Sequence, residues 1–491
     1  MINNKENQIY LGISQDAVYP TKEKAYSPKE EYPEYIFGRN HLSAENQVYE
    51  LIREGFHSLG YDHLNYGTRL WNPLGVLIKK GDTVLIKPNW VMHYNKNKSC
   101  NNNMECLVTH PSMVRAVIDY VLIALCGTGR LIVGDAPMQS CDLQQMFTKM
   151  DYQELFEFYN SKGINLEVLD LRQCRVITKN KVITNTIMIN EEEQSIKVEL
   201  DNASAHEKEV NLQYKVSDYT AKSTNSYHHD RKHTYNVNSN VLQADVIINM
   251  PKPKCHRLAG LTAAQKNMVG ITYDKACLPH RVIGSKTSGG DEYPKNSIIK
   301  SKIALIEEKK LRLSEKHSIC LPMFLQFLTF VLSLVSKGFS RDNIMLGGWY
   351  GNDTIWRTVA DLNVIARYAD KKGVLQDQPQ RSILNIADMI IAGQGNGPLG
   401  PFPKNLGMVL IAEDSSFVDS ICAKIMGFDT DKIPGLNYTL KNNKLHKEGI
   451  KRIVSNNLKY DRVLFDNFMP EEDWRFEPHE CWKGFIECER Y

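Results

Sequence analysis

The stretch ADVIINMPKPKCH, residues 244–256, decides the fold class. Its first half is a short apolar run, which is typical of a strand buried on both faces of a parallel sheet. Two prolines then end the run and stiffen the loop that follows. In open α/β sheets ligands bind beyond the carboxyl ends of the strands, so this loop is a candidate ligand site.

The same rhythm extends in both directions along the chain. Strands that alternate with helices predict an α/β fold, with a mostly parallel sheet, helices on both faces and a ligand crevice at the strand carboxyl ends. Short apolar runs predict strands, and apolar residues at helical spacing predict helices. The predicted strands are 82–87, 129–134, 166–169, 382–391 and 406–412, and the predicted helices are 44–59, 111–126, 143–159, 258–269 and 415–426.

The chain has 491 residues, which exceeds one ordinary core, so we expect one large domain with insertions and extensions. We place the α/β domain at residues 76–430, between an N-terminal extension (1–75) and a C-terminal extension (431–491). Residues 175–240 and 300–345 interrupt the strand and helix pattern, so we expect them to be insertions. Within the first insertion, alternating residues in 182–189 and 196–200 predict a β-hairpin.

The composition excludes several classes of protein. Lys and Arg number 60 against 57 Asp and Glu, a net charge of +3, whereas nucleic-acid binders usually carry a strong basic excess. We therefore expect no nucleic-acid partner. The 11 cysteines include no C-x-x-C pair, which argues against an iron–sulfur ligand motif in this chain. The N-terminus has no apolar signal stretch, so we expect a cytoplasmic protein with reduced thiols.

Polar or glycine-rich residues follow each predicted strand, and parallel strands bring such residues to one edge. Cations in this position suit an anionic ligand such as a phosphate or a carboxylate, and glycines let the backbone approach it closely. Solvated loops with lysines extended into water are the alternative. The candidate anion-binding residues are Lys87, Asn89, His110, Lys252, Lys254, Asn267, Gly395, Gly397 and Arg357.

Four further residues are candidates for catalysis. An unperturbed imidazole titrates near neutral pH, so we expect His256 or His280 to do acid–base work, with Asp135 to orient a histidine. Lys266 follows Thr262 at helical spacing, so the two would share one helix face. If that face points at the crevice, Lys266 adds a cation or a proton donor; otherwise it is solvated.

A divalent metal is a further possibility, without a named zinc motif to identify it. His229 and His233 are four residues apart, so on a helix they would share one face. Asp291 lies in the turn GGDEYP, and Asp353 precedes a predicted helix, so either carboxylate could hold such an ion. Hydrogen-bonding loop histidines and a helix cap at Asp353 are the plainer interpretations.

Residues 319–336, ICLPMFLQFLTFVLSLVS, contain no charged side chain. Three interpretations stay open: a buried or partner-covered helix, a helix lying in a membrane surface, and a membrane span at the lower limit of length. Basic residues flank both ends, so they give no orientation signal. The second interpretation would place a cytoplasmic protein at the inner face of a membrane.

A set of short motifs, in order over residues 80–430, resembles the domain-of-unknown-function-362 family (DUF362). They are KPNW (87–90), THP (109–111), GD (134–135), ADVIINMPKPKCH (244–256), LTAAQKNMVG (261–270), GQGNGPLGP (393–401) and EDSSFVDSICAKIMG (413–427). The resemblance implies that Lys252, Lys254 and His256 share one site. It supplies no substrate, since family members are largely of unknown activity. Some carry a ferredoxin-like iron–sulfur module, which this sequence lacks, so redox chemistry would need a separate redox partner.

Three further motifs resemble a subgroup associated with surface-polysaccharide gene clusters. They are LPHR (278–281), GGDEYP (289–294) and WYGNDTIWRTVADLN (349–363). We therefore expect an enzyme that acts on an anionic small molecule in surface-polysaccharide metabolism, with its reaction open. Two alternatives stay open: a membrane-surface accessory or scaffold protein of glycan assembly, and an iron–sulfur or other metal-linked redox protein.

Overall fold

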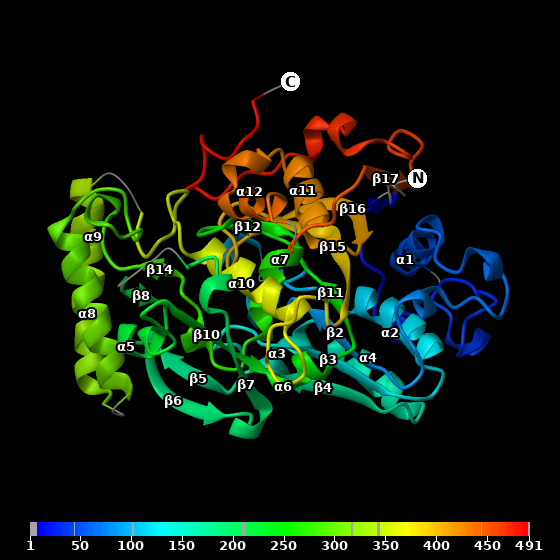
Figure 1. Ribbon diagram of the computed structural model, residues 1–491, viewed down its shortest axis with the longest axis horizontal. Helices are drawn as coiled ribbons and strands as arrows, with labels where there is room; N and C mark the ends of the chain where they lie inside the picture. Colours follow the sequence, from blue (N-terminus) through cyan, green and yellow to red (C-terminus); the bar gives the residue numbers. More distant parts are fainter. Residues whose placement is uncertain are drawn as a thin grey trace.

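The computed structural model describes residues 7–43, 45–100, 103–207, 212–315, 318–340, 344–442 and 444–489. Its centre is a mixed sheet whose main path runs β17-β1-β16-β15-β11-β2-β3-β4 (Figure 1). β16 is antiparallel to both neighbours, and the other adjacent pairs on the path are parallel. The α/β fold with a mostly parallel sheet is thus confirmed. The strands on the path are β1 (Asn7–Ile13), β2 (Thr83–Pro88), β3 (Arg130–Asp135), β4 (Leu166–Asp170), β11 (Val246–Met250), β15 (Ser382–Gln394), β16 (Phe402–Ala412) and β17 (Lys451–Ser455).

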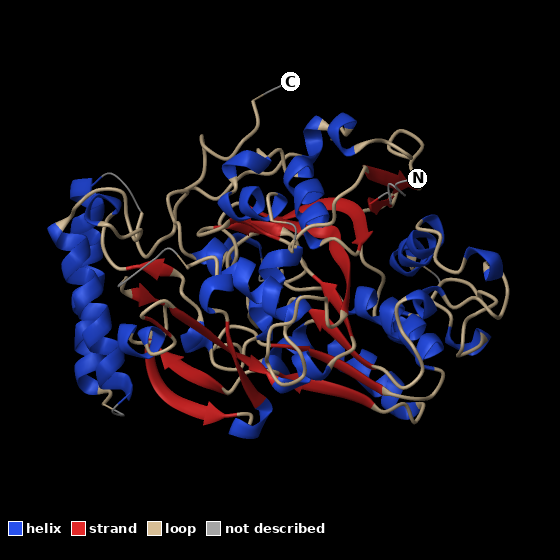
Figure 2. Ribbon diagram, in the orientation of Figure 1, coloured by secondary structure: helices blue, strands red, loops and turns tan. Residues whose placement is uncertain are grey.

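Helices cover both faces of this sheet (Figure 2). This is why β11, which lies between β2 and β15, is buried at all five positions and reads as a continuous apolar run. The α-helices are α1 (Gln47–Ser58), α2 (Pro111–Leu125), α3 (Leu143–Lys149), α4 (Tyr152–Ser161), α5 (Ala221–Asn225), α6 (Ser239–Gln243), α7 (Ala264–Asn267), α8 (Ile298–Glu315), α9 (Cys320–Ser340), α10 (Ile355–Tyr368), α11 (Ser415–Ile425) and α12 (Pro434–Leu440).

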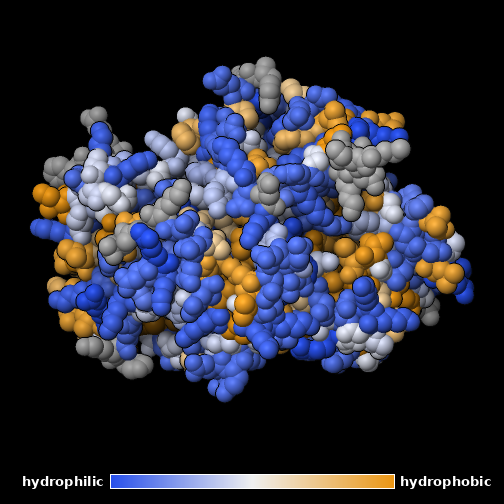
Figure 3. All heavy atoms as spheres, viewed as in Figure 1, coloured by the Kyte–Doolittle hydropathy of each residue, from blue (hydrophilic) through white to orange (hydrophobic). Residues whose placement is uncertain are grey.

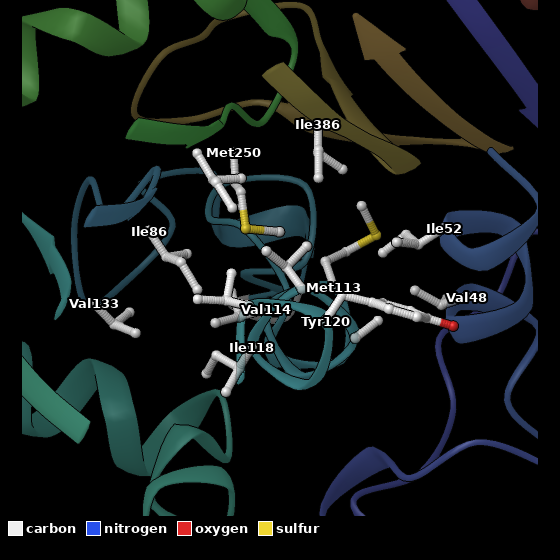
Figure 4. Packing of buried hydrophobic residues seen from close by; sticks show 14 of the residues in the cluster. Val48, Ile52, Ile86, Met113, Val114, Ile118, Tyr120, Val133, Met250 and Ile386 are labelled. Carbon is white, nitrogen blue, oxygen red and sulfur yellow. The ribbon is translucent and has the colours of Figure 1, made fainter. Parts of the chain in front are cut away.

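The central sheet separates the hydrophobic core into two parts, one on each face. On one face, α1 and α2 pack on the side chains of Ile86, Met250 and Ile386, which come from β2, β11 and β15 (Figure 4). On the other face, Ile247 belongs to a cluster with α6 and α10, and β16 packs beneath α11. The two cores fix the positions of the strands, and therefore of the residues at their carboxyl ends.

Both terminal extensions add a strand to the central sheet. β1 pairs with β16 on one side and with β17 on the other. Asp414 caps α11 through the backbone N–H groups of Ser416 and Phe417, and it also accepts a hydrogen bond from Asn7 at 2.9 Å. The predicted domain boundaries stay predictions, but the ends of the chain are tied to the central sheet.

Residues 175–240 form two small β units. β6 (Val182–Met188) pairs with β5 (Cys174–Lys179), whereas β7 (Ser195–Glu199) pairs with β10 (Lys232–Asn238). The predicted hairpin between 182–189 and 196–200 was therefore wrong, because each strand finds a different partner. The other short strands are β8 (Tyr214–Lys215), β9 (His228–His229) and β14 (Arg281–Val282), with β9 paired to β10 and β8 to β14.

The predicted helix over residues 258–269 was also wrong. β12 (Lys254–His256) and β13 (Gly260–Thr262) form a tight antiparallel hairpin, and only Ala264–Asn267 is α-helical. Gly260 makes the turn at φ +75°, and a Cβ there would lie 2.8 Å from Ile486. β12 also lies beside the end of β15, which extends the sheet beyond β11.

α8 and α9 form a helical hairpin at one edge of the molecule (Figure 1). The inner face of α9 buries Leu325, Thr329 and Ser336, whereas large apolar side chains point outward, so its polarity is the reverse of an ordinary surface helix. The exposed residues on α9 include Leu321, Phe324, Phe327, Phe330 and Leu334, which are 44–63% exposed. Apolar residues are visible along this edge in Figure 3. Among the described residues, no helix is long and apolar enough to cross a membrane.

Candidate functional site

A cavity of about 250 Å³ lies at the carboxyl ends of β2, β3 and β11. It is where the sheet geometry places a ligand crevice. Loops after each strand, the β12–β13 hairpin and α7 all contribute to its wall. The polar residues that line it include Asn89, Asp135, Gln139, Asp218, Lys254, His256, Arg257, Thr262, Lys266, Asn267, Lys275 and His280.

Lys87 and Asp135 form a closed pair beside this cavity. The Lys87 ammonium lies 2.8 Å from Asp135 Oδ1 and is wholly buried. The two Asp135 oxygens also accept hydrogen bonds from the backbone N–H groups of Trp90 and Ala136. Burial raises the pKa of Asp135, and the charge of Lys87 opposes that rise. The structure therefore gives Lys87 an internal counterion, and only Asp135 of this pair lines the cavity.

A second closed pair joins Lys252 to Asp388 of β15. Their charged atoms are 2.6 Å apart, both side chains are fully buried, and Tyr19 donates to the other Asp388 oxygen. The same carboxylate accepts the backbone N–H of His110, the residue that caps α2 and stacks on Tyr19. Lys252 and His110 therefore belong to a buried network outside the cavity lining, although the sequence placed both in the anion-binding set.

Lys254 has no carboxylate partner among the described residues. Its ammonium donates to Asn89 Oδ1, to the carbonyl oxygen of Leu107 at 2.7 Å and to that of Lys252 at 3.3 Å. Burial, together with the charge of Lys252, lowers the pKa of Lys254 well below its usual range. Its three donors are thus occupied by neutral oxygens, and it supports Asn89 at the cavity wall.

Lys266 and Lys275 also line the cavity, and neither has a carboxylate partner in the described part of the chain. Lys275 donates to the carbonyl oxygen of Ala136 at 2.8 Å, and burial lowers its pKa to about 8. Lys266 forms no hydrogen bond or ion pair with any described residue. Burial and the charge of Lys275 lower the pKa of Lys266 to about 7. Thr262 and Lys266 both line this cavity, although Thr262 ends a strand and is not part of the helix.

The two candidate catalytic histidines present opposite hydrogen-bonding capacities. His256 Nδ1 accepts the backbone N–H groups of Leu258 and Ala259, both at 3.1 Å, so its proton resides on Nε2. His280 Nδ1 lies 2.8 Å from the carbonyl oxygen of Leu278, so it carries the proton and leaves Nε2 as an acceptor. Burial and the charge of Lys266 lower the pKa of both rings, of His280 to about 3. Both rings are neutral, one a donor and the other an acceptor.

Five polar atoms at the cavity wall are buried and have no hydrogen-bond partner among the described residues. They are Trp90 Nε1, Gln139 Oε1, Arg257 Nε, Thr262 Oγ1 and Asn267 Oδ1. The Asn267 amide nitrogen is held by Asn249 Oδ1 at 2.7 Å, which fixes the direction of the free oxygen. Unsatisfied buried polar atoms are costly, so a group of them at one cavity points to a polar ligand.

Asp419 determines where α7 begins. Its carboxylate accepts the backbone N–H groups of Ala264 and Gln265, at 2.6 and 3.3 Å. Burial raises the pKa of Asp419 to about 7. Since Lys266 and Asn267 lie one turn further on, Asp419 positions the residues that reach the cavity.

A second, more open cavity of about 370 Å³ lies beside the glycine-rich loop 393–401 and shares Arg257 with the first. The Arg257 guanidinium donates to the carbonyl oxygen of Met345, and its Nε is buried without a partner. Gly397 lines this cavity, and a Cβ there would lie 1.9 Å from the carbonyl oxygen of Cys255. Gly395 instead donates its N–H to Glu477 of the C-terminal extension, outside either lining.

The structure does not bring the four predicted metal ligands together. His228 and His229 pair with His233 and Lys232 in a β-hairpin, so His233 faces His228 and the exposed His229 lies on the other side. The expected helical face was wrong because the segment is extended. Within the described residues, no three His, Cys, Asp or Glu side chains lie together so as to hold a metal ion or an iron–sulfur cluster.

Asp291, Asp353 and Arg357 have local structural partners. Asp291 accepts the backbone N–H groups of Val282 and Asp353, and burial raises its pKa to about 6. Asp353 is exposed and pairs with Arg357 at 3.0 Å, one helical turn away. The three side chains organise the start of α10 and lie outside the cavity lining.

Sequence reasoning missed Arg257, Lys275, Gln139 and Thr262 as site residues. Arg257 directly follows the Lys254–His256 strand, so its place at the end of the motif was the available signal. Lys275 and Gln139 lie in irregular segments, where no periodicity indicates the direction of a side chain. Thr262 was noted only as a neighbour of Lys266.

Comparison with known proteins identifies the family. The model of the domain of unknown function DUF362 matches residues 84–198 and 201–424, so the chain belongs to this family. No curated protein matches the sequence. A crystal structure of a protein from Thermotoga maritima is similar at a TM-score of 0.30 and 9% identity, over 73% of this chain and 54% of that one. This chain thus spans about half of that protein, and the similarity is too low to bear on function.

Proposed function

We propose that this DUF362 protein is an enzyme that binds an anionic small molecule, carrying phosphate or carboxylate, in the cavity at the strand carboxyl ends. The observation that carries the proposal is the set of cations there. Lys254, Lys266, Lys275 and Arg257 line one cavity, and none forms an ion pair with a described residue. A buried cation without a counterion is energetically costly. An anion that enters the cavity therefore binds favourably, because it supplies the missing counterion.

The acids at the cavity do not cancel this charge. Asp135 is engaged by Lys87, and Asp218 is exposed and forms no ion pair with a described residue. Arg257 and Lys275 keep donors available for an anionic oxygen, and Thr262 and Asn267 add a hydroxyl and an amide oxygen for its polar substituents. His256 and His280 then supply one hydrogen-bond donor and one acceptor for acid–base chemistry.

The motifs shared with the polysaccharide-cluster subgroup favour a substrate from glycan metabolism, such as a sugar phosphate or a nucleotide sugar. Two neighbouring cavities that share Arg257 in their linings suit an elongated molecule of this kind. No three metal-ligating side chains lie together among the described residues. A divalent ion would therefore bind here together with a phosphate ligand. Metal analysis of protein purified with and without nucleotide tests that role.

A thermal-shift screen tests the proposal. The full chain is heated with inorganic phosphate, pyrophosphate, nucleoside diphosphates, nucleotide sugars and carboxylates, since a ligand of the native state raises its melting temperature. We expect a shift in the wild type that is smaller in Lys266→Met at the same ligand concentration. Lys302→Met, an exposed lysine on α8, is the control and keeps the shift. No shift with any anion, or a shift unchanged in Lys266→Met, contradicts the proposal.

The outward apolar face of α9 supports a location at a membrane surface. Phe324, Phe327 and Phe330 are more than half exposed along one side of the helix, which is the pattern of a helix that lies in a lipid interface. On α8, Lys310 and Arg312 are engaged by Glu307 and Glu308, so apolar insertion is the main attraction in this part of the proposal. Lys316 and Arg341 lie outside the described residues.

Sedimentation with vesicles of phosphatidylglycerol and phosphatidylcholine tests this location. We expect the wild type to sediment and a Phe324→Ser/Phe327→Ser double variant to stay in solution. Leu64→Ser, at a residue 83% exposed in the N-terminal extension, is the control. If the wild type stays in solution and is dimeric by light scattering, a second copy covers the helix instead.

A further inference from the structure

Lys266 is chemically distinct from the other cations of the cavity. The Lys254 ammonium donates to three oxygens, and Lys275 donates to the carbonyl oxygen of Ala136. The Lys266 amine has no such partner among the described residues, although its side chain is half-buried and lines the cavity. Nothing in the described fold requires its proton, and only the unprotonated amine has the lone pair of a nucleophile.

The surroundings of Lys266 are those that a carbonyl group would need. His256 carries an Nε2–H that can donate to a carbonyl oxygen, and His280 offers an Nε2 lone pair that can accept a proton. His256, Lys266 and His280 all line this one cavity. A nucleophile, a donor for the oxygen and a proton acceptor are therefore grouped at one cavity.

Cations remain to hold an anionic group once Lys266 reacts. Arg257 and Lys275 line the same cavity and form no ion pair with a described residue. A ligand with an acidic group beside its carbonyl would place the acid at these two side chains and the carbonyl carbon at Lys266. The chemical class that fits is an anionic aldehyde or ketone, either an α-keto acid or a sugar phosphate in its open form.

We propose that Lys266 forms an imine with the carbonyl carbon of such a ligand. This inference rests on the proposed function, because the cavity must first bind the anion. The amine nitrogen forms a bond to the carbonyl carbon, and the C–O bond then breaks. The two protons of the amine pass to the oxygen, with His280 Nε2 as the carrier, and leave with it as water. No oxidant or reductant is consumed, and His256 holds the oxygen while the charge on it changes.

Reductive trapping tests the imine. The full chain is incubated with pyruvate or with dihydroxyacetone phosphate, and sodium cyanoborohydride then converts an imine into a stable secondary amine. Peptide mass spectrometry locates the adduct, a 1-carboxyethyl group in the case of pyruvate. We expect Lys266 to be modified at least tenfold faster than Lys302, with the faster of the two probes identifying the acid as carboxylate or phosphate.

Two variants separate this inference from the proposed function. Lys266→Arg keeps the charge without a nucleophilic amine, so we expect it to bind phosphate and to lose the adduct. His280→Asn is expected to slow trapping at Lys266, because the proton carrier is lost. In the wild type, phosphate binding without an adduct at Lys266 overturns the imine and leaves the anion site standing. Neither binding nor adduct overturns both, and equal labelling of Lys266 and Lys302 also overturns the imine.

Discussion

Lys252 and Lys254 lie two residues apart, yet they occupy opposite environments. Lys252 pairs with Asp388 at 2.6 Å, whereas Lys254 has only neutral oxygens around its ammonium. The same contrast separates Lys87, which pairs with Asp135, from Lys266. The paired lysines tie neighbouring strands together, and the unpaired ones line a cavity. A buried lysine thus stabilises the fold or prepares a ligand site according to whether a distant strand supplies a carboxylate.

The largest effect on the free energy of unfolding is expected at the ion pair between Lys252 and Asp388. Asp388→Asn leaves the Lys252 charge buried without a counterion, which should lower the free energy of unfolding by about 3–5 kcal/mol. Urea denaturation measures it. Asp473→Asn, at an exposed carboxylate, is the control and should change the same quantity by less than about 0.5 kcal/mol. Equal urea midpoints for Asp388→Asn and Asp473→Asn would contradict a stabilising role for the Lys252–Asp388 pair.

Lys266→Met tests the cavity lysines, which have no carboxylate partner among the described residues. Removing a half-buried charge that has no partner among the described residues should leave the free energy of unfolding unchanged or higher, because no described contact is lost. The affinity for a bound anion should fall by about 10- to 100-fold, the worth of one charge-assisted hydrogen bond. Calorimetric titration and urea denaturation together give both quantities. A variant that unfolds as easily as Asp388→Asn, with its affinity intact, would show Lys266 to be structural.

The pH dependence of anion affinity sharpens the comparison. The pKa of Lys266 is about 7 and that of Lys275 about 8, and a bound anion raises both. Below pH 7 both are charged in either state, so the affinity should be constant. Above pH 7 binding must take up a proton, so the affinity should fall, by at most about tenfold per pH unit for each group. His256 and His280 stay neutral throughout this range.

Lys266→Arg should shift the start of this fall in affinity towards pH 8, because the guanidinium stays charged. A wild-type affinity that rises with pH would contradict the assignment. Reductive trapping should follow the opposite trend and become faster above pH 7, because the imine needs the unprotonated amine.

The smallest effect on stability is expected at α9. Phe324 and Phe327 are 61% and 63% exposed, so their change to serine should alter the free energy of unfolding by less than about 0.5 kcal/mol. The same variant should lose vesicle binding. A large loss of stability in dilute solution would mean that the outward face already packs against part of this chain.

The fold class could be predicted because its signals are local. The apolar runs at β2, β3 and β11 and the spacing in α2 are read within one element, and the structure has them near the expected residues. The helix over 258–269 could not be excluded, because the Gly260 turn depends on contacts with Trp482 and Ile486, more than 200 residues later. The partners of Val182–Met188 and Ser195–Glu199 were likewise decided by tertiary pairing.

The candidate site was predictable as an edge of the sheet, but the roles of its lysines were not. Strand order places Lys254, His256 and Lys266 near one another, which the sequence indicated. The partner of Lys252 comes from position 388, and no spacing rule connects the two. His229 and His233 have the spacing of neighbours on one helix face. The segment is instead a β-hairpin, so the two side chains lie on opposite faces.

Proton uptake on anion binding tests the central claim most directly. Sulfate, which has no titrating proton near pH 8, is titrated calorimetrically into the wild type and Lys266→Met in two buffers of different ionisation enthalpy. If the cavity holds cations that lack a counterion, the wild type binds sulfate and takes up protons, and Lys266→Met binds more weakly with less uptake. Absence of binding, or binding with no uptake and no change in the variant, would contradict the account.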